Sequence, residues 1–195
     1  NAPTQIFDPP VSTPFSQQIG FATEAMYWSA DSRISLPGGG RVLLIMALEA
    51  AFAKGDAING DQIVFTRVRI RIDIPASGAG RTYTVKHPYG MDVFTNVTAG
   101  TRGINSTIDI GVCTGNFTGV LEGSIGPFLR QLSPAPPSGW IGDGATKATV
   151  TGSPNGQNIF RIEGPDIGGA GVNFVQTNLF VSGHKLGTGS PLSLT

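Results

Sequence analysis

The chain of 195 residues carries 13 basic and 13 acidic side chains, so its formal net charge is zero. Charged residues make up 13% of the sequence, whereas soluble domains average about 25%. A neutral chain sets up no long-range field for nucleic acid, so we expect no nucleic-acid partner. The sequence has no apolar run of about 18 residues, and we therefore expect no membrane span.

The composition is compatible with one buried core. Apolar residues make up 39% of the chain, and the single cysteine, Cys113, excludes an internal disulfide. We assign residues 19–186 to a single domain and the Gly/Ser-rich residues 187–195 to a flexible tail. Residues 1–18 contain four prolines, which predicts an extended arm. Such an arm lies over the surface or docks on a neighbouring copy as an added strand.

The segment Arg41–Lys54 is ambiguous. Its Ala, Leu, Met, Glu and Lys residues favour a helix, and Gly55 would suit the end of one. The continuous apolar run Val42–Leu48 also suits a strand that is buried on both faces. Periodicity does not separate the two structures. We favour the strand, because the flanking segments read as strands.

The clearest pattern lies in Gln62–Ile74, QIVFTRVRIRIDI. From Val64 on, every second residue is apolar or Thr. The intervening positions include three arginines, Arg67, Arg69 and Arg71. Alternation with period two predicts a strand with one buried and one polar face. The turn Pro75–Gly80 then predicts a hairpin whose return strand, Arg81–Lys86, extends the polar face beside the arginines.

Short segments rich in β-formers recur along the rest of the chain, separated by turn residues. We expect strands at Met91–Val97, Gly103–Cys113, Ala148–Thr151, Asn158–Glu163 and Val172–Ser182, a turn and strand over Thr114–Gly123, and a long loop over Ser133–Gly144. The pattern predicts an all-β fold, an antiparallel β-sandwich resembling a jelly roll, with at most one short helix.

The arginine row is the first candidate binding site. Three arginines two residues apart share one face and could fan out over an acidic glycan or another anion. Alternatively, they pair across strands with carboxylates of the same polar face. The carboxylates considered for this pairing are Asp73, Asp92, Asp109 and Glu163. Exposed aromatic rings stack on sugars, so Trp140 and Tyr89 are two further candidates, whereas Trp28 belongs to the core.

Other motifs suggest further sites. Asp56, Asn59 and Asp61 offer oxygen ligands for calcium in one loop, but they lack the EF-hand spacing, and an Asx turn explains them better. We expect no other cofactor. Gly111–Gly115 matches a nucleophile elbow with Cys113 in place of serine, yet no helix follows, and we expect a buried thiol instead. The glycine-rich segment Gly164–Gly171 could hold an anion but reads as a hairpin loop.

Three Asn-X-Thr sequons occur close together, at Asn96, Asn105 and Asn116. If a eukaryote secretes the chain, they predict surface glycans. In a bacterium they reflect Thr-rich strands only.

Three runs, GDQIVFTRVRIRIDI, TYTVKHPYG and IFRIEGPDIGGAGVNFVQTNLF, resemble segments of uncharacterised secreted or surface-exposed bacterial proteins. The resemblance covers the chain roughly from Tyr27 to Lys185. It implies secretion and a β-rich fold, and it favours a strand at Arg41–Lys54. It carries over neither an activity nor catalytic residues.

These observations favour a non-enzymatic extracellular β-sandwich module at the cell surface, for attachment, structure or glycan binding. Its partners would be a glycan or cell-surface polymer, or copies of itself. One alternative is a self-assembling fibre subunit that uses the N-terminal arm. A second is an enzyme acting on polysaccharide, although spacing pairs none of the candidate acids Glu24, Glu49, Glu122 and Glu163.

Overall fold

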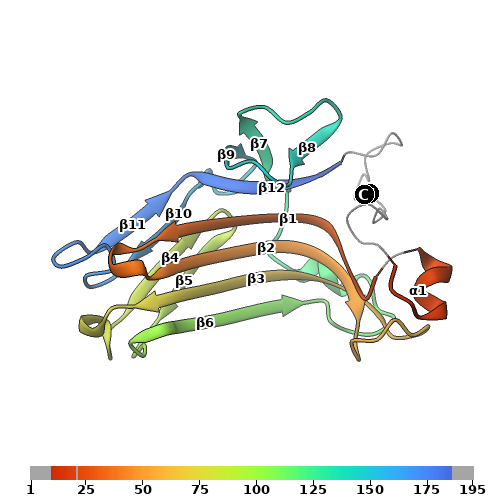
Figure 1. Cartoon of the computed structure of the whole chain (residues 1–195), viewed down its shortest axis with the longest axis horizontal. Helices are drawn as coiled ribbons and strands as arrows, with labels where there is room; N and C mark the ends of the chain where they lie inside the picture. The colour runs from red at the N-terminus through yellow and green to blue at the C-terminus, as the bar shows by residue number, and fades with distance from the viewer. Residues whose placement is uncertain (1–9, 21, 186–195) are drawn as a thin grey trace.

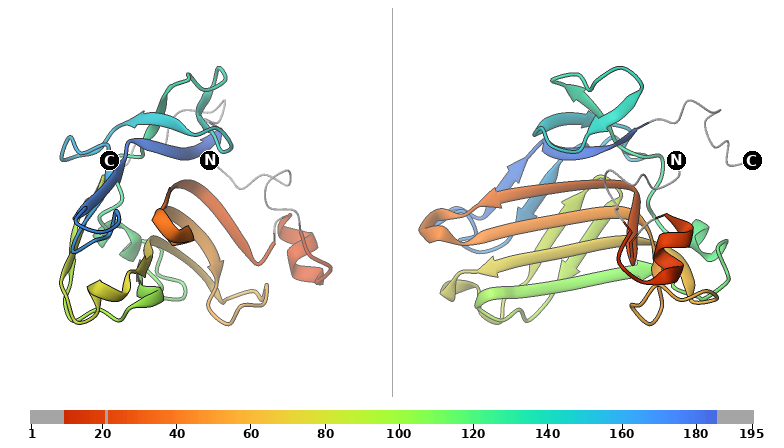
Figure 2. Two further views of the ribbon diagram at one scale, coloured as in Figure 1. Left: turned by 60° about the vertical axis from the view of Figure 1, so that its left-hand side comes forward. Right: turned by 45° about the vertical axis from the view of Figure 1, so that its right-hand side comes forward.

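The computed structural model describes residues 10–20 and 22–185, whose strands form two antiparallel sheets packed face to face (Figure 1, Figure 2). The larger sheet contains, in order, β6 (Gly100–Ile110), β3 (Gln62–Ile74), β2 (Arg41–Phe52), β1 (Glu24–Ser35), β12 (Leu179–Lys185), β9 (Ala148–Thr151) and β7 (Arg130–Ser133), with β8 (Trp140–Asp143) paired to β12. The smaller sheet contains β11 (Phe174–Thr177), β10 (Phe160–Glu163), β4 (Tyr83–His87) and β5 (Gly90–Phe94). The predicted all-β, antiparallel sandwich is confirmed.

The ambiguous segment forms strand β2, as favoured from the sequence. β2 pairs with β1 on one side and with β3 on the other. Its inward residues, including Leu44 and Met46, are fully buried, and its outward residues Leu43 and Ile45 are half-buried. Over this run one face of β2 is buried in the core and the other is half-buried, so the expected burial on both faces holds only in part.

The predicted hairpin between β3 and β4 is wrong. β3 pairs with β6, whereas β4 lies in the smaller sheet between β10 and β5. The connection includes the short 3-10 turn η2 (Ala76–Gly78) and carries the chain across the sandwich. The polar face of β4 therefore does not extend the arginine face of β3.

The core lies between the two sheets. Inward residues of β2 and β3 meet Tyr83 and Val85 of β4 and Phe160 and Ile162 of β10. Trp28 of β1 is fully buried, as expected. Its ring stacks on that of Phe128, a loop residue, with ring centroids 5.0 Å apart.

Four further segments differ from expectation. The expected strand Val172–Ser182 divides into β11 of the smaller sheet and β12 of the larger sheet. Helix α1 (Pro14–Ile19) occupies part of the predicted extended arm, whose residues 1–9 lie outside the described part of the chain, as does the predicted tail. Thr114–Gly123 contains the 3-10 turn η3 (Gly119–Glu122) instead of a strand. The loop Ser133–Gly144 contains β8. The expected loop at Gly164–Gly171 does join the paired strands β10 and β11.

Several connections gather at one end of the sandwich, on the left in Figure 1. They are the β1–β2 turn with η1 (Pro37–Gly39), the start of the β3–β4 connection, the start of β6 and the β10–β11 loop. This end holds the cavities described next.

Candidate functional site

The three arginines of β3 lie on the outer face of the larger sheet but have different surroundings. Arg67 is enclosed, with 15% of its side chain exposed. Its Nε and Nη2 each donate to Asp109 of β6 at 2.8 Å, and its Nη1 donates to Glu49 of β2 at 2.9 Å. Its guanidinium also lies 4.9 Å from the ring centroid of Phe65. Arg67 therefore belongs to a structural network of ion pairs, and its guanidinium is not available to a ligand.

Arg69 and Arg71 are paired with neutral groups instead. Arg69 Nε donates to Thr107 at 3.2 Å, and Arg71 Nε donates to Asn105 at 3.3 Å. Neither arginine has an ion pair among the described residues. Of the acids expected to pair with the row, Asp109 alone does so, because Asp92 and Glu163 lie on the smaller sheet and Asp73 binds backbone amides.

A groove on the outer face of the larger sheet joins Arg71 to cationic side chains from other strands. We call it the basic groove, and its volume is about 380 Å³. Its cationic lining residues are Arg33, Arg41, Arg71, Arg102 and Lys147. Asp73 is the single carboxylate among its described lining residues.

Strand register brings these residues together. Arg33 of β1 pairs with Leu43 of β2, which pairs in turn with Arg71 of β3. Arg33 and Arg71 are therefore two strand spacings apart, which places their Cα atoms about 10 Å from each other. Arg41 begins β2, and Arg102 lies near the start of β6, where the β3–β6 register shifts. Half-buried Leu43 thus lies between cationic side chains.

The electrostatics of the groove favour an anion. Arg41, Arg102 and Lys147 are exposed, and within the described chain they have no ion pair, nor does Arg71. Loss of solvent lowers the pKa of Arg71, and the positive charge of Arg102 lowers it further. Of the five groove cations, only Arg33 has an acidic side-chain partner within the described residues, Asp31, at 3.2 Å. A bound anion would relieve the repulsion between these cations.

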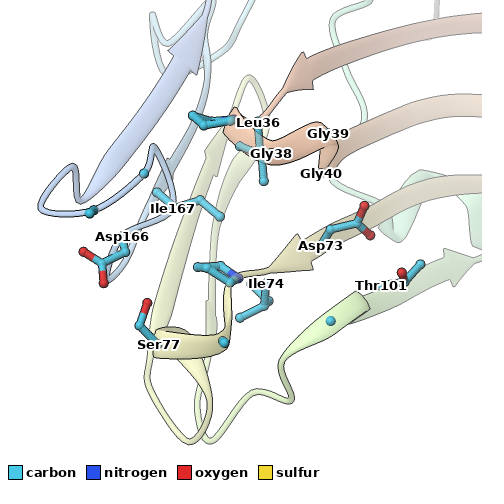
Figure 3. Close-up of a pocket in the computed structure, with 16 residues that line it drawn as sticks. Leu36, Gly38, Gly39, Gly40, Asp73, Ile74, Ser77, Thr101, Asp166 and Ile167 are labelled. Atoms are coloured by element: carbon cyan, nitrogen blue, oxygen red, sulfur yellow. The ribbon is translucent and has the colours of Figure 1, made fainter.

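A larger crevice, of about 770 Å³, opens at the same end of the sandwich (Figure 3). Asp166 and Ser77 lie on one side of it, and Asp73 and Thr101 on the other. Asp166 has φ +55°, and its carboxylate accepts a hydrogen bond from the Gly171 amide at 2.7 Å. A hydrogen bond with Ser77 lowers the pKa of Asp166. The crevice and the basic groove share Asp73 and Thr101, so they adjoin.

The two aromatic candidates do not line these cavities. The expectation that Tyr89 offers an exposed ring is wrong, because Tyr89 is 6% exposed and packs edge-on against Trp28. Its hydroxyl donates to the Pro127 carbonyl at 2.8 Å. Trp140 is half-buried at the start of β8, and its role as a sugar platform stays a prediction.

The oxygen ligands proposed for calcium already have protein partners in two cases. Asp61 lies 3.2 Å from Lys54 Nζ, and Asn59 accepts a hydrogen bond from Gln62 at 3.2 Å, whereas Asp56 is exposed. Among residues 10–20 and 22–185, no three His, Cys, Asp or Glu side chains form a group that could hold a metal ion. Nothing in the loop adds to the calcium hypothesis.

The remaining predicted residues lie on the surface. Asn96, Asn105 and Asn116 are all exposed, so glycosylation at these positions stays a prediction. The expectation that Cys113 is buried is wrong, because β6 ends at Ile110 and Gly111 turns the chain with φ +104°. The thiol is therefore exposed to solvent.

Sequence reasoning missed the four cations that join Arg71 in the basic groove, because they lie on separate strands. No local spacing links Arg33, Arg41, Arg102 and Lys147. Knowledge of the strand order would have placed Arg33, Arg41 and Arg102 near Arg71, because β1, β2 and β6 belong to the same sheet as β3. It also missed that Glu24 and Glu49 meet at Arg67, whose Nη1 lies 3.7 Å from Glu24 and 2.9 Å from Glu49.

Comparisons with protein-family models, with curated proteins and with solved structures found no match to this chain. In the described part of the chain, no helix has both the length and the apolar character needed to cross a membrane.

Proposed function

We propose that the chain is a non-enzymatic, extracellular binding module that attaches to an acidic glycan through the basic groove. The observation that carries the proposal is the convergence of five cationic side chains in one groove of a chain with zero net charge. Random placement of 13 basic and 13 acidic residues would bring similar numbers of both signs to one groove, whereas this groove has five cations and one carboxylate among its described lining residues.

The groove suits carboxylate or sulfate groups carried on a polymer. A guanidinium presents a planar fork of donors that matches both groups. Because these cations are solvated, each contact is weak, and affinity requires several contacts at once. The half-buried Leu43 between Arg33 and Arg71 offers an apolar strip for the sugar ring between two charged groups. Binding should therefore weaken as salt rises.

Calorimetric titration with a heparin hexasaccharide, polygalacturonate and neutral dextran tests the proposal. We expect binding of at least one acidic glycan, no binding of dextran, and at least about tenfold weaker binding for Arg71→Glu/Arg102→Glu. The matched control is Arg81→Glu/Arg130→Glu, which changes the net charge equally at exposed arginines that do not line the groove. Equal losses in both double variants, or equal binding of dextran, would refute the proposal.

A second candidate function is assembly of copies of the chain. The outermost strands β5 and β6 favour it, because Met91, Val93 and Ile108 on them are about half-exposed or more. Exposed apolar strands at sheet edges are common pairing sites. Size-exclusion mass and negative-stain microscopy distinguish this candidate, since filaments support it and a monomer of 20.3 kDa opposes it.

A further inference from the structure

We propose that Asp73 is a positioning residue that builds the basic groove, so that anion binding depends on a carboxylate inside a cationic site. The inference rests on the proposed function and names how its site is held together. The inference assigns different roles to two carboxylates near these cations, Asp73, which lines the groove, and Asp31, which pairs with Arg33.

Asp73 connects the backbones that carry two of the groove arginines. It lies one residue before the end of β3, between β2 and β6 in the sheet. Its Oδ2 accepts the backbone N–H of Arg41 at 2.9 Å, and its Oδ1 accepts the backbone N–H of Arg102 at 2.8 Å. One side chain thus holds the start of β2 and the start of β6 at fixed positions around the groove.

The backbone of Arg102 needs this support. Arg102 has φ +53°, a left-handed conformation that is unfavourable for any residue with a Cβ atom. It lies where the β3–β6 register shifts between Ile72 and Ile74, so the regular ladder does not hold it. The hydrogen bond to Asp73 offsets the unfavourable conformation and orients the side chain toward the groove.

Asp73 performs this role without neutralising the arginine side chains. It has no ion pair in the part of the chain described, and each of its two oxygens accepts a backbone amide. The guanidiniums of Arg41 and Arg102 are left for a ligand. Asp31 differs, because its Oδ2 lies 3.2 Å from Arg33 Nε and competes directly with an anion for that cation.

The two carboxylates therefore predict opposite effects of the same substitution. Asp31→Asn removes a competing charge, and we expect it to tighten binding of the heparin hexasaccharide about two- to threefold. Asp73→Asn also removes a negative charge, but its amide group cannot accept both N–H groups. We expect this variant to bind at least about tenfold more weakly, because two arginines lose their positions.

Calorimetric titration over a series of salt concentrations separates positioning from general destabilisation. Loss of ionic contacts makes the dependence of log Kd on log salt shallower, and we expect this in Asp73→Asn. Partial unfolding would lower the active fraction and leave that slope unchanged. Amide hydrogen exchange supplies a readout without ligand, and we expect Arg41 and Arg102 to lose protection in Asp73→Asn.

Each outcome supports or overturns the inference. Opposite shifts for Asp31→Asn and Asp73→Asn, with a shallower salt slope for the second, support it. Tighter binding by both variants, or unchanged amide protection, overturns the role of Asp73 while leaving the proposed function intact. Absence of binding by the wild-type protein overturns both.

Discussion

Glu49 allows a quantitative test of the buried charge network on the larger sheet. Its side chain is 1% exposed, and it shares one guanidinium, that of Arg67, with Asp109 and Glu24. If all three acids were ionised, their charge would exceed that of Arg67 by two. In the ionised form, Oε1 of Glu49 would also be a buried acceptor without a donor. A proton on Glu49 resolves both problems, because the acid can then donate to Glu24.

This environment raises the pKa of Glu49 to about 8 from its ordinary value of 4.5. Burial is the largest cause, followed by the hydrogen bond with Glu24, and Arg67 opposes them. Because the folded state retains a proton that the unfolded state releases, the stabilisation is complete below pH 4.5 and is lost as pH rises toward 8. The greatest slope for one proton is about 1.4 kcal/mol per pH unit.

Replacement by glutamine keeps the donor toward Glu24 and the acceptor toward Arg67 but removes the titration. We therefore expect Glu49→Gln to gain about 2–3 kcal/mol relative to the wild-type protein between pH 5.5 and 7.5. Urea unfolding at four pH values measures this difference, and Glu122→Gln, at an exposed glutamate, is the matched control. Stability curves that run parallel in the wild-type protein and Glu49→Gln would refute the reasoning. So would a loss of about 3–5 kcal/mol at every pH, the cost of breaking a fully ionised buried pair.

Two further predictions test corrections to the sequence-based expectations. Tyr89→Phe should cost about 1–3 kcal/mol in urea unfolding, because the Pro127 carbonyl and the buried Leu129 amide lose their partner. Tyr27 is half-buried, and its hydroxyl has no hydrogen bond to another described residue, so Tyr27→Phe should change stability by less than about 0.5 kcal/mol. Equal losses in the two variants would contradict the role of the Tyr89 hydroxyl. Cys113 should react with a thiol reagent in the folded protein as fast as in urea, and protection in the folded state would contradict its exposure.

The features predicted correctly from the sequence are those whose cause is local. Alternation in β3 follows from the pleat of one strand, so Arg67, Arg69 and Arg71 could be placed on one face without any knowledge of neighbouring strands. The surroundings of each arginine could not be predicted this way. Whether Arg67 meets Asp109 or Arg71 meets Asn105 depends on the strand that pairs with β3, and a hairpin with β4 was the wrong choice.

The errors at single residues have the same origin. Tyr89 follows His and Pro in a turn sequence typical of surfaces, but the turn at this point lies over Trp28 and closes the core. Cys113 follows an apolar stretch that reads as a buried strand, yet the strand ends three residues earlier. In both cases tertiary packing, which no short segment specifies, decides whether the side chain is buried.

Strands β11 and β12 are separated by Asn178 alone, although they belong to different sheets. Val175 packs on the core from the smaller sheet, and Phe180 is buried in the larger sheet. The number of residues between them is therefore fixed. Deletion of one residue here would turn every following side chain to the opposite face and bring Phe180 to the surface. Natural variation in chain length should accordingly be absent at Asn178 and concentrated in the loop Gly164–Gly171, where an added residue leaves both strands in register.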